Sequence, residues 1–281
     1  MKKILLATTV LAATAGFASA DVSISGAGRM GIIQQKIDGK VETQFSSRLR
    51  IKFSASGTTD GGLTFGGAVR NDQDGVGNTA NGNSTVFVSG AFGTLTFGDV
   101  AGGAADNLVG QISGVGFTGL GDANEIAFTD STATAVRYDY TSGALSVSLG
   151  ASQTTASYGY KKTSAAVKYD GGTWNVAVGY EDEQDYTMVS AKVSATFGPA
   201  TVQAKYADWS GYKPGLGISL DYAVSTALTV TAFYTDDYDA EEYRAKGIGA
   251  TYDLGGGAKV IGGVVNNNGS TLADLGVTLA F

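Results

Sequence analysis

The segment from Val41 to Ser56 restricts the fold of the whole chain more than any other part of the sequence. Apolar side chains recur at its odd positions, namely Val41, Phe45, Leu49, Ile51, Phe53 and Ala55. Its even positions carry Glu42, Gln44, Ser46, Arg48, Arg50, Lys52, Ser54 and Ser56. A period of two is typical of a β-strand with one apolar and one polar face. Strands of globular proteins are usually about 5 to 6 residues long, whereas a tilted membrane-spanning strand needs about 9 to 11, so this length favours a membrane strand with an overhang.

Fifteen further segments have strand character and are separated by turn signals. The sixteen predicted strands cover residues 21–35, 41–56, 63–70, 85–91, 94–99, 133–142, 144–152, 162–170, 173–182, 186–197, 200–208, 216–223, 228–236, 243–253, 258–266 and 271–281. The chain contains 42 glycines, and glycine disfavours helix interiors. Because helix periodicity is also nearly absent, we predict an all-β protein.

The connections between these strands fall into two sets. Those after even-numbered strands are short turns, such as Phe92–Gly93 and Gly198–Pro199. Those after odd-numbered strands are mostly longer and polar, including residues 72–83, 101–131, 208–215 and 236–242. An even number of tilted antiparallel strands with short turns at one rim and long loops at the other is the architecture of an outer-membrane barrel. We therefore predict a sixteen-stranded antiparallel transmembrane β-barrel.

The first twenty residues, Met1 to Ala20, read as a secretory signal peptide. Two lysines precede an apolar run from Ile4 to Ala13, and Ala18-Ser19-Ala20 is a small-residue cleavage site. Such a segment is excluded from the fold, so the predicted barrel domain covers residues 21–281. Its removal leaves 17 of the 19 Lys and Arg residues against 26 Asp and Glu residues, a formal balance of −9.

The composition excludes several classes of function. The chain has no cysteine and no histidine, which rules out a disulfide framework, a thiolate or histidine metal site and a Ser-His-Asp triad. The acidic balance argues against nucleic acid as a partner, since nucleic-acid binding needs a basic surface. No catalytic residue and no cofactor are predicted.

The stretch from Ala101 to Ser131 has neither strand alternation nor helix periodicity. A structureless connection of about 30 residues is uncommon in a compact domain unless it has a function. We predict that this third long loop folds into the lumen of the barrel and narrows it.

Alternate residues of a barrel strand face the lumen, and we say that residues at these positions have lumen parity. Basic residues with lumen parity form a predicted patch on the first three strands. Counting from the strand ends puts Arg29, Arg48 and Arg70 at a similar height, with Arg50 and Lys52 beneath them. Such a patch would be costly in a dry core, so it indicates a water-filled interior. We name Arg29, Arg48, Arg50, Lys52 and Arg70 the basic wall.

Carboxylates of the long loop supply the opposite sign at Asp106, Asp122, Glu125 and Asp130. Opposed charges within one screening length of about 8 Å would set up a transverse electric field across a narrow constriction of the channel. Small polar solutes would pass such a constriction, whereas apolar ones would be hindered. The alternative is that these are ordinary solvated charges. Arg137 and Asp139 share lumen parity and are candidates to anchor the loop's return or to form a salt bridge with it.

Two acidic clusters fall in predicted outer loops, Glu181 to Asp185 and Asp236 to Glu242. Clustered carboxylates can hold a divalent cation such as calcium, which prefers oxygen ligands. The alternative, a hydrated run of charges, is the one we favour.

The C-terminal strand, Thr271 to Phe281, carries Leu275, Val277 and Leu279 on one face and ends in phenylalanine. With the tight-turn strand FGTLTFGD (Phe92 to Asp99) leading into the long third loop, and with sixteen strands, the chain resembles the general bacterial porins of the Rhodobacter type. The resemblance extends from the signal peptide to Phe281. It implies a homotrimer of barrels in the bacterial outer membrane, with the third loop in each lumen and Phe281 as the assembly signal.

The function implied is passive diffusion of small hydrophilic solutes and ions through a water-filled channel, with outer-membrane lipid and lipopolysaccharide as surroundings. An alternative is a substrate-specific outer-membrane channel with a solute-binding site, which a run of lumen-facing aromatic residues would favour; the sequence has none. A barrel enzyme and a structural barrel with a filled lumen are the remaining alternatives.

Overall fold

The computed structural model describes residues 21–37, 40–74, 78–100, 103–126, 135–152, 161–183, 185–236 and 244–281. The predicted signal peptide lies outside these residues, and its assignment stays a prediction. In the part of the chain described, no helix is long and apolar enough to cross a membrane.

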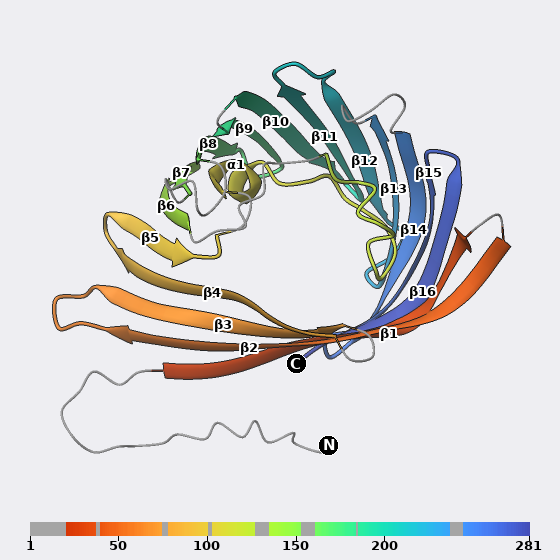
Figure 1. Cartoon of the computed structure of the whole chain (residues 1–281), viewed down its shortest axis with the longest axis horizontal. Helices are drawn as coiled ribbons and strands as arrows, with labels where there is room; N and C mark the ends of the chain where they lie inside the picture. Colours follow the sequence, from red (N-terminus) through yellow and green to blue (C-terminus); the bar gives the residue numbers. More distant parts are fainter. Residues whose placement is uncertain are drawn as a thin grey trace.

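Sixteen antiparallel strands form a closed barrel (Figure 1). The strands are β1 (Asp21–Ile37), β2 (Lys40–Thr58), β3 (Thr64–Asp74), β4 (Asn78–Gly90), β5 (Gly93–Gly98), β6 (Ala135–Ser142), β7 (Leu145–Ala151), β8 (Lys162–Asp170), β9 (Trp174–Glu183), β10 (Tyr186–Phe197), β11 (Ala200–Trp209), β12 (Gly215–Ala223), β13 (Leu228–Asp236), β14 (Arg244–Gly255), β15 (Ala258–Asn267) and β16 (Ser270–Ala280). The helix α1 (Gly103–Leu108) lies between β5 and β6 in the chain. Pairing of β1 with β16 closes the ring, so the predicted fold class is confirmed.

The predicted polar loop over residues 72–83 is wrong. β3 continues to Asp74 and β4 begins at Asn78, with Asp72 paired to Ala80 in the ladder. The Asp, Asn and Gly residues of this segment suggested a loop. Their backbone groups are instead paired in the β3–β4 ladder. The contrast between the two rims is therefore weaker than predicted, since the β1–β2, β3–β4, β9–β10 and β15–β16 connections contain only two or three residues.

The wall has its apolar side chains on the outside. Phe45 is 93% exposed and Val22 is 71% exposed on the outer face of β2 and β1. Exposed aromatic residues gather near the strand ends, with Tyr140, Tyr169, Trp174, Tyr222 and Tyr252 beside the short turns and Tyr180, Tyr206 and Tyr234 toward the other rim. Aromatic belts of this kind occur at the two interfaces of a membrane, so the outer face suits lipid rather than water.

Residues 103–126, here named the inner loop, run inside the ring of strands (Figure 1). Six of its apolar side chains are at most 3% exposed: Ala104, Ala105, Val109, Ile112, Leu120 and Ile126. Ile112 and Leu120 pack in one cluster with inward-facing Phe233 and Val265, and Ile126 packs in another with Met188. The interior therefore has a small apolar core between the inner loop and the wall.

Glycines in the wall make room for the inner loop. Gly31 pairs with Gly276 across β1 and β16, and a Cβ built on either would lie 2.8 Å from the ring of Phe117. Gly249 pairs with Gly263 across β14 and β15, and Val115 packs on that pair. Apolar side chains of the loop therefore lie directly against the wall backbone. A side chain larger than hydrogen at these four wall positions would push the loop into the opening.

Replacing Gly263 by valine tests this packing. A Cβ at this position would lie 2.8 Å from the Gly116 nitrogen and 3.1 Å from Val115 Cβ, and overpacking of this kind costs typically about 1 to 3 kcal/mol. We expect Gly263→Val to lower the free energy of unfolding in urea, measured in lipid vesicles. The control is Gly28→Val, where a Cβ meets no atom closer than 3.8 Å. Equal stability of the two variants would contradict close seating of the loop.

Candidate functional site

The inner loop is attached at its start through α1, which packs against β7, β8 and β9. Ala104 and Ala105 are fully buried there. The Ala104 N–H donates to Ser164 Oγ at 2.8 Å, and Asn107 Nδ2 donates to Asp139 Oδ1 at 2.8 Å. The first turn of the inner loop is thus fixed to the wall by both packing and hydrogen bonds.

Two lysines hold the middle of the inner loop. Lys192 Nζ donates to the Gln111 carbonyl at 2.9 Å. Lys205 Nζ, on a side chain that is 1% exposed, donates to Gln111 Oε1 at 2.7 Å and to the Ile126 carbonyl at 2.8 Å. Gln111 also exchanges hydrogen bonds with the backbone of Ile126 at 2.9 Å. The two limbs of the loop are therefore joined to each other and to β10 and β11.

Carboxylates on β12 and β16 secure the rest of the inner loop. Ser113 Oγ donates to Asp221 Oδ2 at 2.6 Å. The Thr118 N–H and hydroxyl donate to Asp274 Oδ2 at 2.9 and 2.7 Å. From the sequence, lumen parity was the only signal for these wall residues, and their role in holding the loop was not predicted. The attachments follow the wall from β6 round to β16, so the described loop lines one side of the opening.

The basic wall is brought together on β1, β2 and β3, but its register differs from the predicted one. Arg29 and Arg48 are cross-strand partners, as predicted from their similar height. Arg70 is the partner of Lys52 and lies four residues along from the level of Arg48. The prediction counted heights from assumed strand ends, whereas tilt and stagger of the strands set the register in a barrel. Arg29 Nη1 also reaches the Thr118 carbonyl of the inner loop at 3.5 Å.

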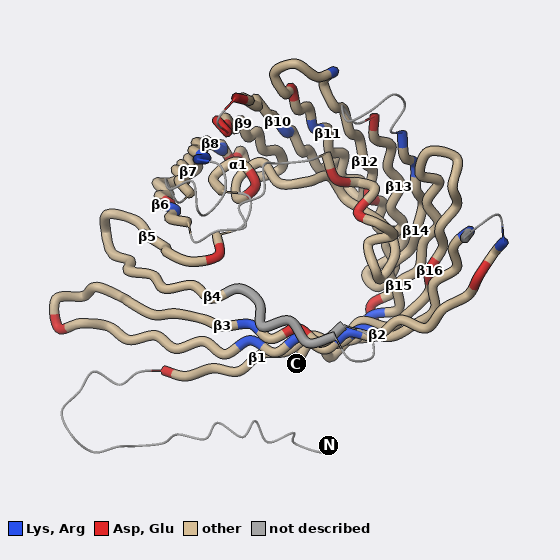
Figure 2. Tube along the Cα trace, viewed as in Figure 1, with Lys and Arg blue, Asp and Glu red and all other residues tan. Residues whose placement is uncertain are grey.

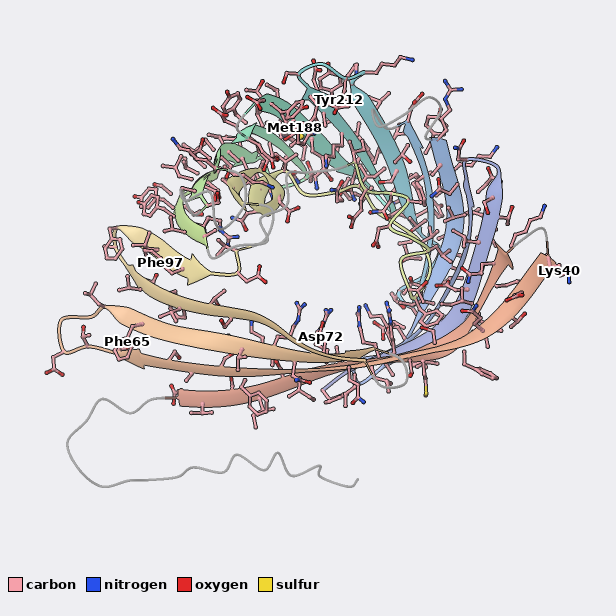
Figure 3. The ribbon with its side chains drawn as sticks, viewed as in Figure 1. Lys40, Phe65, Asp72, Phe97, Met188 and Tyr212 are labelled. Atoms are coloured by element: carbon pink, nitrogen blue, oxygen red, sulfur yellow. The ribbon has the colours of Figure 1, made fainter. Side chains whose placement is uncertain are left out.

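The basic wall contains a carboxylate that the sequence reading had placed in a loop. Asp72 lies on the inner side of β3 (Figure 3) and is the cross-strand partner of Arg50. Its Oδ2 lies 2.8 Å from Arg50 Nη2, and its Oδ1 lies 2.9 Å from Arg70 Nε. The mutual repulsion inferred from the sequence is therefore reduced within the wall itself.

The acidic residues of the inner loop are found on the far side of the opening. Asp106 belongs to α1, and Asp122 and Glu125 are exposed in the stretch that follows. Asp130 lies outside the described residues. Figure 2 shows acidic segments along the inner loop and basic segments on β2 and β3, with the opening between them.

Arg137 and Asp139 pair with each other on β6, with Arg137 Nε 2.9 Å from Asp139 Oδ2. Asp139 also accepts hydrogen bonds from Asn107 and Ser148. The pair therefore contacts the start of the inner loop, at α1. The loop's return, over residues 127–134, lies outside the part of the chain described.

The predicted acidic clusters are only partly described. Glu181 is buried at 2% exposure, and Glu183 forms an ion pair with Lys162 at 3.2 Å. Within the described ranges, no three carboxylates gather closely enough to hold a metal ion. Residues 237–243 of the second cluster are not among those described. The calcium hypothesis therefore stays a prediction.

Glu125 has a perturbed acidity. Glu125 keeps part of its surface in solvent. Partial desolvation of its carboxyl group raises its pKa above the ordinary glutamate value of 4.5, and Asp122 and Asp106 raise this pKa further, whereas Lys205 acts in the opposite direction. The charge of Glu125 is therefore sensitive to mild acid.

A closed antiparallel barrel with an apolar outside, a charged inside and a loop along one inner side has the architecture of a transmembrane channel. The Gram-negative porin family model matches residues 7–272, and the chain belongs to this family. It is an outer-membrane channel through which small hydrophilic solutes and ions diffuse passively.

Related proteins and structures extend over almost the whole chain. The porin of Rhodobacter capsulatus is 32% identical over 307 residues, covering 93% of this chain and 100% of that protein. The porin of Fuscovulum blasticum is 29% identical, with the same coverage. A porin structure refined at 1.8 Å is 30% identical with a TM-score of 0.75, and a mutant of Rh. blastica porin is 25% identical with a TM-score of 0.80; each covers 93% of this chain and 100% of the other.

Mild acid should alter the ion preference of the channel. As the pH falls from neutrality toward 4.5, Glu125 gains a proton before an ordinary glutamate does, because its pKa is raised. The inner loop then loses negative charge, so we expect the cation-to-anion permeability ratio to decrease. Reversal potentials in a salt gradient measure this ratio. Glu125→Gln should remove most of the change, and an undiminished change in that variant would assign it to another group.

Proposed function

We propose that the basic wall and the acidic residues of the inner loop form the constriction of the channel. The observation that carries this proposal is the separation of charge in Figure 2, with basic residues on β1 to β3 and carboxylates on the inner loop. The attachments of Ala104, Gln111 and Thr118 to the wall support a fixed position for the loop. A fixed loop keeps the two signs apart.

Separated charges of opposite sign create a field across the path of a solute. A dipolar solute can turn to align with this field, and a small ion meets a partner of opposite charge on either side. An apolar solute gains nothing from the field and must displace ordered water. The constriction therefore favours small hydrophilic solutes over apolar ones of the same size.

Neutralising two arginines of the basic wall tests their place at the constriction. We expect Arg48→Gln combined with Arg50→Gln to shift ion preference toward cations by several-fold, because two positive charges within roughly 8 Å of the path are lost. The measurement is the reversal potential of single channels in planar bilayers under a potassium chloride gradient.

The matched control is Lys36→Gln combined with Lys40→Gln. Both lysines are exposed near the far end of the β1–β2 hairpin, and Figure 3 labels Lys40 there, away from the opening. The control removes the same formal charge. An equal shift in both double variants would show that ion preference depends on the net charge of the protein rather than on charges at the constriction.

We also propose that the mature chain begins at Asp21, after export with Met1–Ala20 as signal peptide, and assembles as a homotrimer in contact with lipid and lipopolysaccharide. Family membership supports the trimer, and the small-residue site Ala18-Ser19-Ala20 supports the cleavage. For assembly, we propose Phe281 as the signal; its backbone exchanges hydrogen bonds with Gly26 and its ring is 64% exposed.

Native mass spectrometry of the protein purified from outer membranes tests the first two points together. We expect three copies of a chain that starts at Asp21. A monomer mass would reject the trimer, and a chain retaining residues 1–20 would reject the cleavage.

A further inference from the structure

The basic wall is not a row of free cations, because one carboxylate lies among them. Asp72 faces Arg50 across the β2–β3 ladder and follows Arg70 by two residues along the same face of β3. Residues two apart on a strand share a face, so the carboxylate is flanked by both guanidinium groups. Figure 3 shows it directed into the opening from β3.

The two arginines contact Asp72 in different ways. Arg50 approaches side-on, with Nε donating to both carboxylate oxygens at 3.0 Å and Nη2 lying 2.8 Å from Oδ2. Arg70 Nε lies 2.9 Å from Oδ1 as an ion pair, without a hydrogen bond from that nitrogen. Side-on pairing fixes the plane of a guanidinium group, so Arg50 is oriented by Asp72, whereas Arg70 Nε forms an ion pair with the other carboxylate oxygen.

Exposure shows which of these groups a solute meets. The Asp72 side chain is 15% exposed, and those of Arg50 and Arg70 are 31% and 32% exposed. The carboxylate is therefore less accessible to a solute than the two arginine side chains, which keep more of their surface in the water of the opening. Its charge still acts on the path, because screening in salt extends over about 8 Å.

We propose that Asp72 is a selectivity-determining residue of the channel. It offsets one of the five positive charges of the basic wall and holds the Arg50 guanidinium group toward β3, which limits the preference of the constriction for anions. This inference rests on the proposed function, in which the basic wall lines the constriction. Asp72 differs from the acidic residues of the inner loop, since it acts from within the basic side.

The test is Asp72→Asn, with the chloride-to-potassium permeability ratio read from reversal potentials in planar bilayers. We expect the ratio to rise about threefold, the size of effect expected for one unit charge roughly 8 Å from an ion in water. Asp60→Asn is the matched control, because Asp60 is exposed in the turn between β2 and β3 and its loss changes the formal charge equally. The control should leave the ratio unchanged.

A ratio in Asp72→Asn equal to that of the wild type, or a rise matched by Asp60→Asn, would overturn the inference. If Arg48→Gln with Arg50→Gln still shifts the ratio, the proposed constriction stands and Asp72 alone is excluded. If neither variant shifts it, the constriction itself is misassigned.

A second comparison applies if Asp72→Asn does not assemble. Arg50→Gln is compared with the double variant Arg50→Gln and Asp72→Asn, which has the formal charge of the wild type and leaves no unpaired partner between these two residues. We expect the double variant to have the higher chloride-to-potassium ratio. Equal ratios would overturn the role of Asp72.

Discussion

Closure of the sheet by the pairing of β1 with β16 is the constraint on which the rest of the structure depends. A backbone N–H or C=O facing hydrocarbon has no water to bond, so a strand can cross a membrane only where both edges are paired. Nine cross-strand pairs, from Ala27 with Ala280 to Gln35 with Leu272, join the two ends of the barrel. With no edge left, the outer side chains are free to be apolar and the inner ones to be polar.

The arrangement of apolar side chains outside and polar side chains inside decides how the inner loop is held. A loop in a water-filled lumen gains less from apolar burial than one in a dry core, and each of its hydrogen bonds competes with water. The structure combines two solutions. Paired glycines at Gly31–Gly276 and Gly249–Gly263 let Phe117 and Val115 lie against the backbone, and the buried Lys205 ammonium bonds both limbs of the loop. Burial of Lys205 at 1% exposure excludes competing water from those bonds.

The alternation of apolar and polar residues in the sequence predicts the β-barrel fold, and the segment from Val41 to Ser56 alone predicts a membrane strand. It predicts less about the site, for identifiable reasons. Asn, Gly and Asp between residues 72 and 83 resemble a loop, because turn propensity is local whereas the ladder from Asp72 to Ala80 is a tertiary pairing. Likewise the level of Arg70 depends on stagger between strands, which no count along one strand supplies. The wall glycines were counted as evidence against helix, and their role as a seat for the loop needs the register of four strands.

The mixed charge of the basic wall follows from the same geometry. Side chains two apart on a strand and those facing across a ladder are within about 5 to 8 Å, so five cations on three adjacent inner faces cannot avoid one another by moving along the wall. Water in the lumen weakens their repulsion but does not remove it. A carboxylate at Asp72 lowers it between Arg50 and Arg70, and it costs little in access because it is less exposed than either arginine. A barrel that must present positive charge to passing solutes is thus more stable with a partner for that charge built into the wall than with cations alone.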